Sequence, residues 1–134
     1  MTIRRLDHVA VPVDQMEPMV AFYASLGFVV DESLAPLLVS VSAGDMKINL
    51  HDRSLWESGM FDLRGPTAVP GCLDICVVWD GDGTDLDALL TDASIEVIEG
   101  PVERDGGRDR GTATGMSRYV RDPDGNLVEF IMYP

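Results

Sequence analysis

A histidine near the start of the chain and a glutamate near its end are the residues whose surroundings suggest chemistry. His8 stands in the run Leu-Asp-His-Val-Ala-Val, and Glu129 stands in the run Leu-Val-Glu-Phe-Ile. If both runs are strands, each polar side chain shares its face with apolar residues two positions away on either side. A carboxylate in such surroundings needs a partner or a metal ion, because burying it alone is costly.

An internal repeat adds two further polar residues to this pair. The matching segments are residues 8–14 with 74–80 and residues 46–51 with 126–131. This alignment places Asp74 over His8 and Asn49 over Glu129. If a twofold axis relates the halves, all four positions face one concave site. His, Asp and Glu are ordinary ligands of a divalent metal there, and Asn is a weak fourth. Taken singly, His8 could also be a hydrogen-bonded core residue, and Glu129 could face solvent.

The second histidine, His51, lies two residues beyond Asn49 and shares its strand face. Three roles are open to it: a metal ligand, a general acid or base at the rim of the site, or a strand-end surface residue. A phosphate-binding loop is not indicated, because the glycine-rich run 105–111 lacks the Lys-Ser/Thr end of such a loop.

Hydrophobic periodicity indicates which elements carry these residues. Helical spacing predicts helices over residues 15–25 and 84–93, the second capped by Thr84. Apolar runs predict strands over residues 6–13, 28–30, 36–42, 46–51, 72–79, 95–98, 117–121 and 126–132. Each half is then strand, helix and three strands. We therefore expect an α+β fold of two tandem βαβββ modules, forming a curled mixed sheet around a concave site.

One domain is expected over residues 1–134. Its parts are a first module over about 1–52, a connector over about 53–71 and a second module over about 72–134. The connector has no clean period, and a short helical piece is expected near Trp56. Residues 103–116 are predicted to be a mobile loop, either a lid over the site or plain surface disorder.

Composition excludes some partners. The chain has 23 acidic and 10 basic residues and a net charge of −13, which argues against a nucleic-acid partner. No apolar run reaches the roughly 18 residues that span a membrane, and the N-terminus lacks a signal peptide, so we expect a cytoplasmic protein without a membrane partner. Cys72 and Cys76 stand too far apart in a predicted strand for a disulfide, and we interpret them as small core residues.

Three motifs give the sequence a family likeness. They are the opening Leu-Asp-His-Val-Ala-Val, the segment Phe22-Tyr-Ala-Ser-Leu-Gly27 and the closing segment Arg121-Asp-Pro-Asp-Gly-Asn-Leu-Val-Glu-Phe130. The chain resembles the vicinal oxygen chelate superfamily, which contains glyoxalases, bleomycin-resistance proteins and extradiol dioxygenases. Residues 46–51 and 99–104 further resemble the subgroup of glyoxalase domain-containing protein 5-like proteins.

This resemblance implies paired βαβββ modules, a homodimer and a divalent metal held by the first and last strand of each module. Carried over, the ligands are His8, Asn49, Asp74 and Glu129. Asn49 departs from the Glu of glyoxalase I, and Asp74 departs from the His that is usual there and in extradiol dioxygenases. An iron extradiol enzyme needs two histidines and one carboxylate, which this chain provides only if His51 is the second histidine.

Two functions remain in view, beside a third hypothesis in which the protein is a remnant that uses only its dimer interface. The first is a metal-dependent enzyme with Fe, Mn, Ni or Zn, acting on a small oxygenated substrate by glyoxalase-like lyase or isomerase chemistry or as a dioxygenase. Glu129 or His51 would then move the proton. The alternative is a metal-free small-molecule binding protein of the bleomycin-resistance type. Its groove for a cationic ligand would be lined by the aromatic residues Trp56, Phe61 and Trp79.

Overall fold

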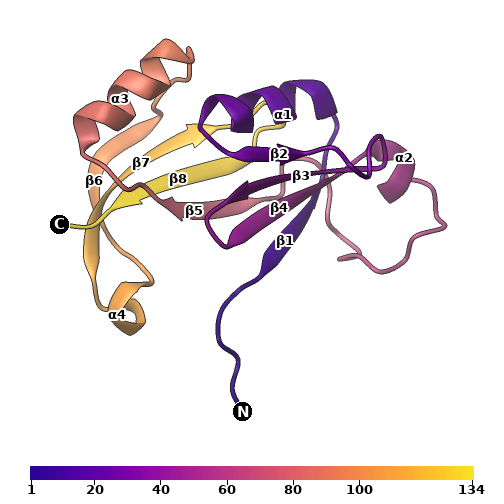
Figure 1. Cartoon of the computed structure of the whole chain (residues 1–134), viewed down its shortest axis with the longest axis horizontal. Helices are drawn as coiled ribbons and strands as arrows, with labels where there is room; N and C mark the ends of the chain where they lie inside the picture. The colour runs from indigo at the N-terminus through magenta and orange to yellow at the C-terminus, as the bar shows by residue number, and fades with distance from the viewer. The chain divides into compact units, whose positions relative to one another are not determined.

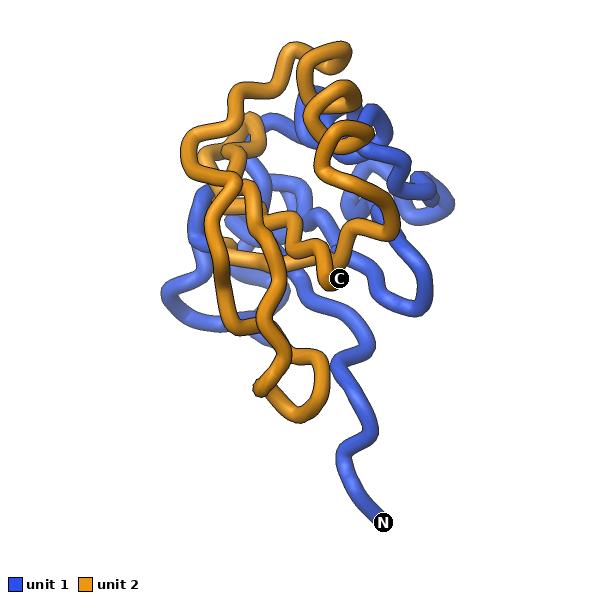
Figure 2. Tube along the Cα trace, turned by 90° about the vertical axis from the view of Figure 1, so that its left-hand side faces the viewer, with its two compact units in different colours: residues 1–72 blue, residues 73–134 orange.

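Each half of the chain folds as a strand, a helix and three further strands. A computed structural model describes residues 1–134 and divides them into two units, residues 1–72 and residues 73–134, which Figure 2 colours separately. The first unit contains β1 (His8–Pro12), α1 (Met16–Ser25), β2 (Val29–Asp31), β3 (Leu38–Ala43), β4 (Met46–His51) and α2 (Arg53–Trp56). The second contains β5 (Asp74–Val78), α3 (Gly83–Asp92), β6 (Glu99–Asp105), α4 (Arg108–Gly111), β7 (Thr114–Arg121) and β8 (Leu127–Met132).

The two sheets have the same topology. Their strand orders are β1-β4-β3-β2 and β5-β8-β7-β6, and in each the first strand runs parallel to the last strand of its own unit. The remaining pairs, β2–β3, β3–β4, β6–β7 and β7–β8, are antiparallel. The structure therefore confirms the predicted α+β fold with two βαβββ modules (Figure 1).

Each unit buries the sheet face that its long helix covers. In the first unit α1 buries Met19 and Tyr23, and the sheet buries Ile48 and Leu50. In the second unit the core includes Leu86 and Leu90 of α3 and Val120, Val128 and Phe130 of the sheet. Burying one such side chain contributes about 1.5–3 kcal/mol, so these alternating strand positions hold each module together.

The two long helices end in the same way, which supports the repeat. Gly27 and Ser94 follow the helices with φ values of 90° and 57°. The next N–H in each case donates back to the helix, from Phe28 to Tyr23 O at 3.1 Å and from Ile95 to the Leu90 carbonyl at 2.8 Å. This left-handed ending closes the last turn, and Ser94 adopts it although only glycine does so without strain.

Three local predictions are wrong. The strand predicted over 95–98 lies instead at Glu99–Asp105, because only the end of the predicted segment reaches β7, where the Ile98 N–H donates to the Tyr119 carbonyl at 2.9 Å. The loop predicted over 103–116 is reduced to residues 106–113, since β6 and β7 extend into both of its ends. The side chain that caps α3 is Asp82, which accepts from the Asp85 N–H at 2.9 Å, and not Thr84.

The interpretation of the two cysteines as core residues is also wrong. Cys72 and Cys76 are both exposed and unpaired. Cys76 belongs to the face of β5 that α3 leaves open, and Cys72 precedes the strand. The helices of the structure are all too short or too polar to cross a membrane.

The turn between β7 and β8 is held by a fully buried asparagine. Asn126 is 0% exposed, and its Nδ2 donates to Asp122 Oδ2 at 2.8 Å. Its Oδ1 accepts from the Leu73 N–H at 2.9 Å, which ties the turn to the residue before β5. Burying these groups is favourable only while all of them are bonded.

We predict that Asn126→Ala lowers the free energy of unfolding by about 1–3 kcal/mol, because it leaves buried groups of Asp122 and Leu73 without partners. Urea denaturation followed by circular dichroism measures the change. Asp80→Ala is the control, because Asp80 is exposed and makes no hydrogen bond or ion pair, and it should stay within about 0.5 kcal/mol of the parent. Equal stabilities of the two variants would contradict the role of the turn.

Candidate functional site

The sheet of the second unit leaves one face uncovered by its helix. We call this the open face of the second unit, and it carries alternate residues of three strands: Asp74, Cys76, Val78, Ser117, Tyr119, Leu127, Glu129 and Ile131. Glu129 lies at its centre, because β8 is the second strand of the sheet and pairs Glu129 with Cys76 on one side and with Tyr119 on the other.

Glu129 has hydrogen-bonding partners but no cation. The buried Ser117 hydroxyl donates to Glu129 Oε1 at 2.5 Å. No arginine, lysine or histidine of the unit forms an ion pair with the carboxylate. A half-buried carboxylate without a cation is a functional-site candidate, since the site retains a charge that the fold does not neutralise.

The two neighbours of Glu129 in the sheet are held in their neutral forms. Partial burial of the sulfur first, and the Glu129 carboxylate next, raise the pKa of the Cys76 thiol to about 12. Burial also raises the pKa of Tyr119, although the hydrogen bond from Arg104 Nε to its hydroxyl, at 3.1 Å, acts in the opposite direction. At neutral pH both groups can donate a proton, and Cys76 is a poor nucleophile.

Two cavities of the second unit meet at Glu129. One, of about 400 Å³, is lined by Asp74, Arg104 and Tyr119 among others. The other, of about 480 Å³, is lined by Cys76, Arg108 and Tyr133 among others. Both volumes lie in the range of small-molecule sites, about 300–1,000 Å³. The predicted residues Asp74 and Glu129 thus share one face and one cavity.

The first unit places its three predicted residues on the corresponding face. His8 lies opposite Lys47, two positions before Asn49, just as Asp74 lies opposite Leu127, two positions before Glu129. Asn49 Oδ1 accepts from the Ser40 hydroxyl at 2.8 Å. His8 Nδ1 lies 2.7 Å from Asp7 Oδ1, and this contact lowers the pKa of Asp7. The register of both sheets therefore agrees with the alignment of the repeat.

His51 is half-buried at the end of β4. Its ring meets that of Phe61 edge-on, with 5.8 Å between the centroids. Burial first, and the charge of Arg64 second, lower the pKa of His51. The imidazole is therefore neutral at pH 7 and can accept a proton or a metal through a ring nitrogen.

The aromatic residues predicted to line a groove are partly engaged elsewhere. The Trp56 indole N–H donates to the Val13 carbonyl at 3.0 Å, and the guanidinium carbons of Arg53 and Arg64 lie 5.3 and 5.5 Å from its ring centroid. The Trp79 indole N–H donates to the Asp82 carbonyl at 3.2 Å. Trp56 already binds two protein cations, so it is poorly suited to a cationic ligand.

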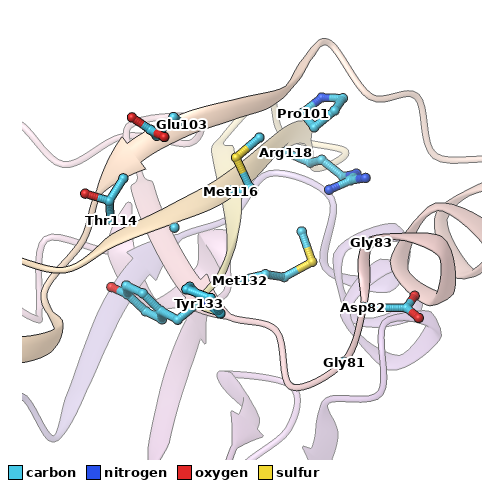
Figure 3. Close-up of a pocket in the computed structure, with 12 residues that line it drawn as sticks. Gly81, Asp82, Gly83, Pro101, Glu103, Thr114, Met116, Arg118, Met132 and Tyr133 are labelled. Atoms are coloured by element: carbon cyan, nitrogen blue, oxygen red, sulfur yellow. The ribbon is translucent and has the colours of Figure 1, made fainter.

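A third cavity of the second unit, of about 550 Å³, lies on the opposite side of the sheet (Figure 3). Met116, Met132 and the first turn of α3 surround it, and Arg118 enters it from β7. The Arg118 side chain is 8% exposed and binds Asp87 of α3 through two hydrogen bonds of 2.5 and 2.9 Å. None of the predicted site residues lines this cavity, and its one buried charge is already paired.

Sequence reasoning missed several residues around Glu129: Ser117, Tyr119, Arg104, Arg108 and Tyr133. The sequence did contain a signal for Ser117 and Tyr119. The turn centred on Asp124 fixes the pairing of β7 with β8, so counting outward from it places Tyr119 opposite Glu129. Tyr133 and Arg108 meet through a loop, for which no such count exists.

Two known proteins are more than 30% identical to this chain over nearly its whole length. No protein-family model matches it. The virulence protein STM3117 of Salmonella typhimurium is 36% identical over 138 residues, covering 99% of this chain and 87% of that protein. The glyoxalase domain-containing protein RDO1 of Mycosarcoma maydis is 33% identical over 135 residues, covering 99% of this chain and 70% of that protein.

Solved structures agree with the fold. The crystal structure of virulence protein STM3117 matches with a TM-score of 0.86 and 33% identity over 100% of both chains. A lactoylglutathione lyase from Agrobacterium tumefaciens matches with a TM-score of 0.71 and 22% identity, over 98% of this chain and 96% of that chain. The bleomycin resistance determinant of transposon Tn5 matches with a TM-score of 0.60 and 19% identity, over 97% and 98%. At these lower identities the likeness shows the fold alone.

Two βαβββ modules are the fold that this chain shares with the lactoylglutathione lyase and the bleomycin resistance determinant. Relatives above 30% identity that span nearly the whole chain carry the assignment further. The chain belongs to the glyoxalase-domain family, within the vicinal oxygen chelate superfamily.

The pKa of His51 gives a test of the first unit. We predict that Arg64→Gln raises it, since a positive neighbour is removed, and that it stays below about 6.5 because burial is the larger cause. Arg64→Lys keeps the charge and should leave the pKa close to that of the parent. An NMR titration of the ring protons measures all three. Because the lowered pKa makes the unfolded chain bind more protons, His51 also lowers stability as the pH falls below about 6.5.

The thiol of Cys76 gives a test of the second unit. We predict slow alkylation by iodoacetamide at pH 8 in EDTA-treated protein, because a thiol with a pKa of about 12 is almost wholly protonated. Glu129→Gln should speed the reaction by removing the second cause of the shift. Mass spectrometry that resolves the sites supplies exposed Cys72 as an internal reference. An unchanged rate in Glu129→Gln would show that the carboxylate does not act on the thiol.

Proposed function

We propose that the chain is a metal-dependent enzyme acting on a small oxygenated substrate, by lyase, isomerase or dioxygenase chemistry. The observation that carries this proposal is Glu129. A carboxylate at the centre of a sheet, which forms no ion pair, shares an open face and a cavity with the carboxylate of Asp74. Two such carboxylates favour a cationic partner.

In this proposal His8, Asp74 and Glu129 hold a divalent metal, Fe, Mn, Ni or Zn, with Asn49 as a weak fourth ligand. The donor set fits such an ion, since it combines imidazole nitrogen with carboxylate and amide oxygens. No three His, Cys, Asp or Glu side chains are grouped so that they could hold a metal ion, so the choice of ligands in this proposal rests on the alignment of the repeat. A bound metal would chelate two neighbouring substrate oxygens and stabilise the developing oxyanion.

The chain's own residues supply the remaining steps. Ser117 fixes Oε1 of Glu129 by its hydrogen bond, which aims the carboxylate at the cavity. Glu129 or His51 then moves the proton in a lyase or isomerase reaction, and the lowered pKa of His51 keeps its imidazole free to accept one. The protonated Tyr119 hydroxyl can donate to a substrate oxygen from the adjacent strand.

The proposal also includes membership of a subgroup. Similarity to a glyoxalase domain-containing protein and to a virulence protein supports membership among the glyoxalase domain-containing protein 5-like proteins. Asn49 and Asp74 depart from glyoxalase I ligands, which favours a different substrate. A homodimer is part of the proposal on family likeness alone. A cytoplasmic location stays a prediction from the sequence.

One observation favours the alternative, a metal-free binding protein. The side-chain oxygens of Glu129 and Asn49 already accept hydrogen bonds from serine hydroxyls, at 2.5 and 2.8 Å. These partners satisfy both groups without a metal. The bleomycin resistance determinant of transposon Tn5, a resistance protein, shares this fold.

Metal content decides between the two. We predict a stoichiometric transition metal in protein purified without a histidine tag and its loss in Asp74→Ala and Glu129→Ala, measured by elemental mass spectrometry. Asp80→Ala, which removes an exposed acid of the same unit, should retain the metal. Circular dichroism confirms that each variant is folded.

Two results would overturn the enzyme proposal. One is protein that stays free of metal after incubation with manganese, iron, nickel and zinc. The other is a folded Glu129→Ala variant that keeps stoichiometric metal. Either would favour the binding protein.

A further inference from the structure

Arg108 presents an unused guanidinium group beside Glu129. It lines the cavity of about 480 Å³ that also contains Glu129 and Cys76. Its guanidinium carbon lies 4.0 Å from the ring centroid of Tyr133. A guanidinium has five N–H donors, and no group of the protein accepts from those of Arg108. Stacking on Tyr133 therefore fixes the cation while its donors stay available to a ligand.

The position of Arg108 is built by its surroundings. The Tyr133 hydroxyl accepts from the backbone N–H of Arg108 at 3.3 Å. A side chain on Gly106 would collide with that hydroxyl, so glycine is required there. The Gly106 N–H donates to the Ala113 carbonyl at 2.9 Å, which closes the loop. Its left-handed residues Asp109 and Arg110, with φ of 52° and 60°, are costly conformations for side chains to hold.

Arg108 is one of few basic residues in an acidic chain, and two charged groups near it are bonded elsewhere. The chain has a net charge of −13, and three of its ten basic residues, Arg104, Arg108 and Arg110, fall within seven positions. Arg104 lines the second cavity at Glu129, and its Nε and Nη1 bind the Tyr119 hydroxyl and the Glu103 carbonyl. Asp105, which lines the same cavity as Arg108, accepts from the Thr114 hydroxyl at 3.1 Å. Neither Asp105 nor the adjacent Asp109 forms an ion pair with Arg108. Arg108 is therefore the basic residue of its cavity, and its guanidinium group forms no ion pair.

We propose that Arg108 binds the carboxylate of a small anionic ligand in this cavity. The planar guanidinium matches a carboxylate with two parallel hydrogen bonds. Val78 and Ile131, which line the same cavity, receive an apolar body, and the oxygen functions of the ligand reach Glu129. This inference rests on the proposed function, in that it takes the open face of the second unit as the ligand site. It replaces the cationic ligand that the acidic composition suggested with an anionic one.

Benzoate and benzamide form the test pair, because they share size and shape and differ in charge. The ¹⁵N-labelled full chain is titrated with each, and NMR follows the Arg108 Nε–Hε signal and the amides of Gly106 and Gly107. Benzoate is expected to shift these signals saturably and to bind more tightly than benzamide. Arg108→Gln should weaken benzoate binding by about tenfold or more and leave benzamide binding unchanged.

Arg110→Gln is the matched control, since it removes an equal charge two residues away, outside the cavity. It should bind benzoate as the parent does. Equal binding of benzoate and benzamide, no saturable shift with benzoate, or equal losses in Arg108→Gln and Arg110→Gln would each overturn the inference.

The metal measurement separates this inference from the proposed function. Charge-dependent benzoate binding at Arg108 in a chain that takes up no metal would support the anion site and refute the enzyme. Stoichiometric metal with no benzoate binding at Arg108 would refute the anion site alone.

Discussion

A strand can bury only every second side chain against its helix, and this alternation decides where Glu129 points. Val128 and Phe130 are buried on the side that α3 covers, so Glu129 between them must face the other way. The carboxylate then lies in the second strand of the sheet, with β5 and β7 on either side. The carboxylate forms no ion pair. Its neighbours accommodate it instead through the hydrogen bond from Ser117 and through a thiol and a phenol that stay neutral.

The fold could be predicted from the sequence because its signals are local and repeated. The alignment that placed Asp74 over His8 and Asn49 over Glu129 agrees with the register of both sheets, and the turn at Asp122–Asn126 fixed the last hairpin. The strand β6 was missed because pairing is a property of two segments. Residues 95–98 have the apolar alternation of a strand, yet the ladder begins at Glu99 and carries an irregularity before Val102.

The site was predictable only in part, for a related reason. Glu129 and Asp74 could be found because polar residues among apolar strand neighbours are visible in one segment. Arg108 and Tyr133 are 25 residues apart in the chain and meet through a loop whose shape depends on Gly106 and on two left-handed residues. The cysteines were misassigned because a short apolar run does not indicate which of its two faces a helix will cover. The sequence therefore did not determine which residues far apart in the chain come into contact, or which face of a strand its helix covers.

The separation of the two sheet faces has a consequence for how such a protein can evolve. Positions such as Val128 and Phe130 carry the stability of the module, while Cys76, Tyr119 and Glu129 on the open face contribute little to the core. Substitutions at these three positions can therefore accumulate with small cost to folding. The same duplicated scaffold already displays this freedom internally. One copy presents histidine, asparagine and lysine where the other presents aspartate, glutamate and leucine, on sheets of identical topology. Ancestral duplication followed by divergence of one face would let descendants of a single module exchange ligands without having to invent a new fold.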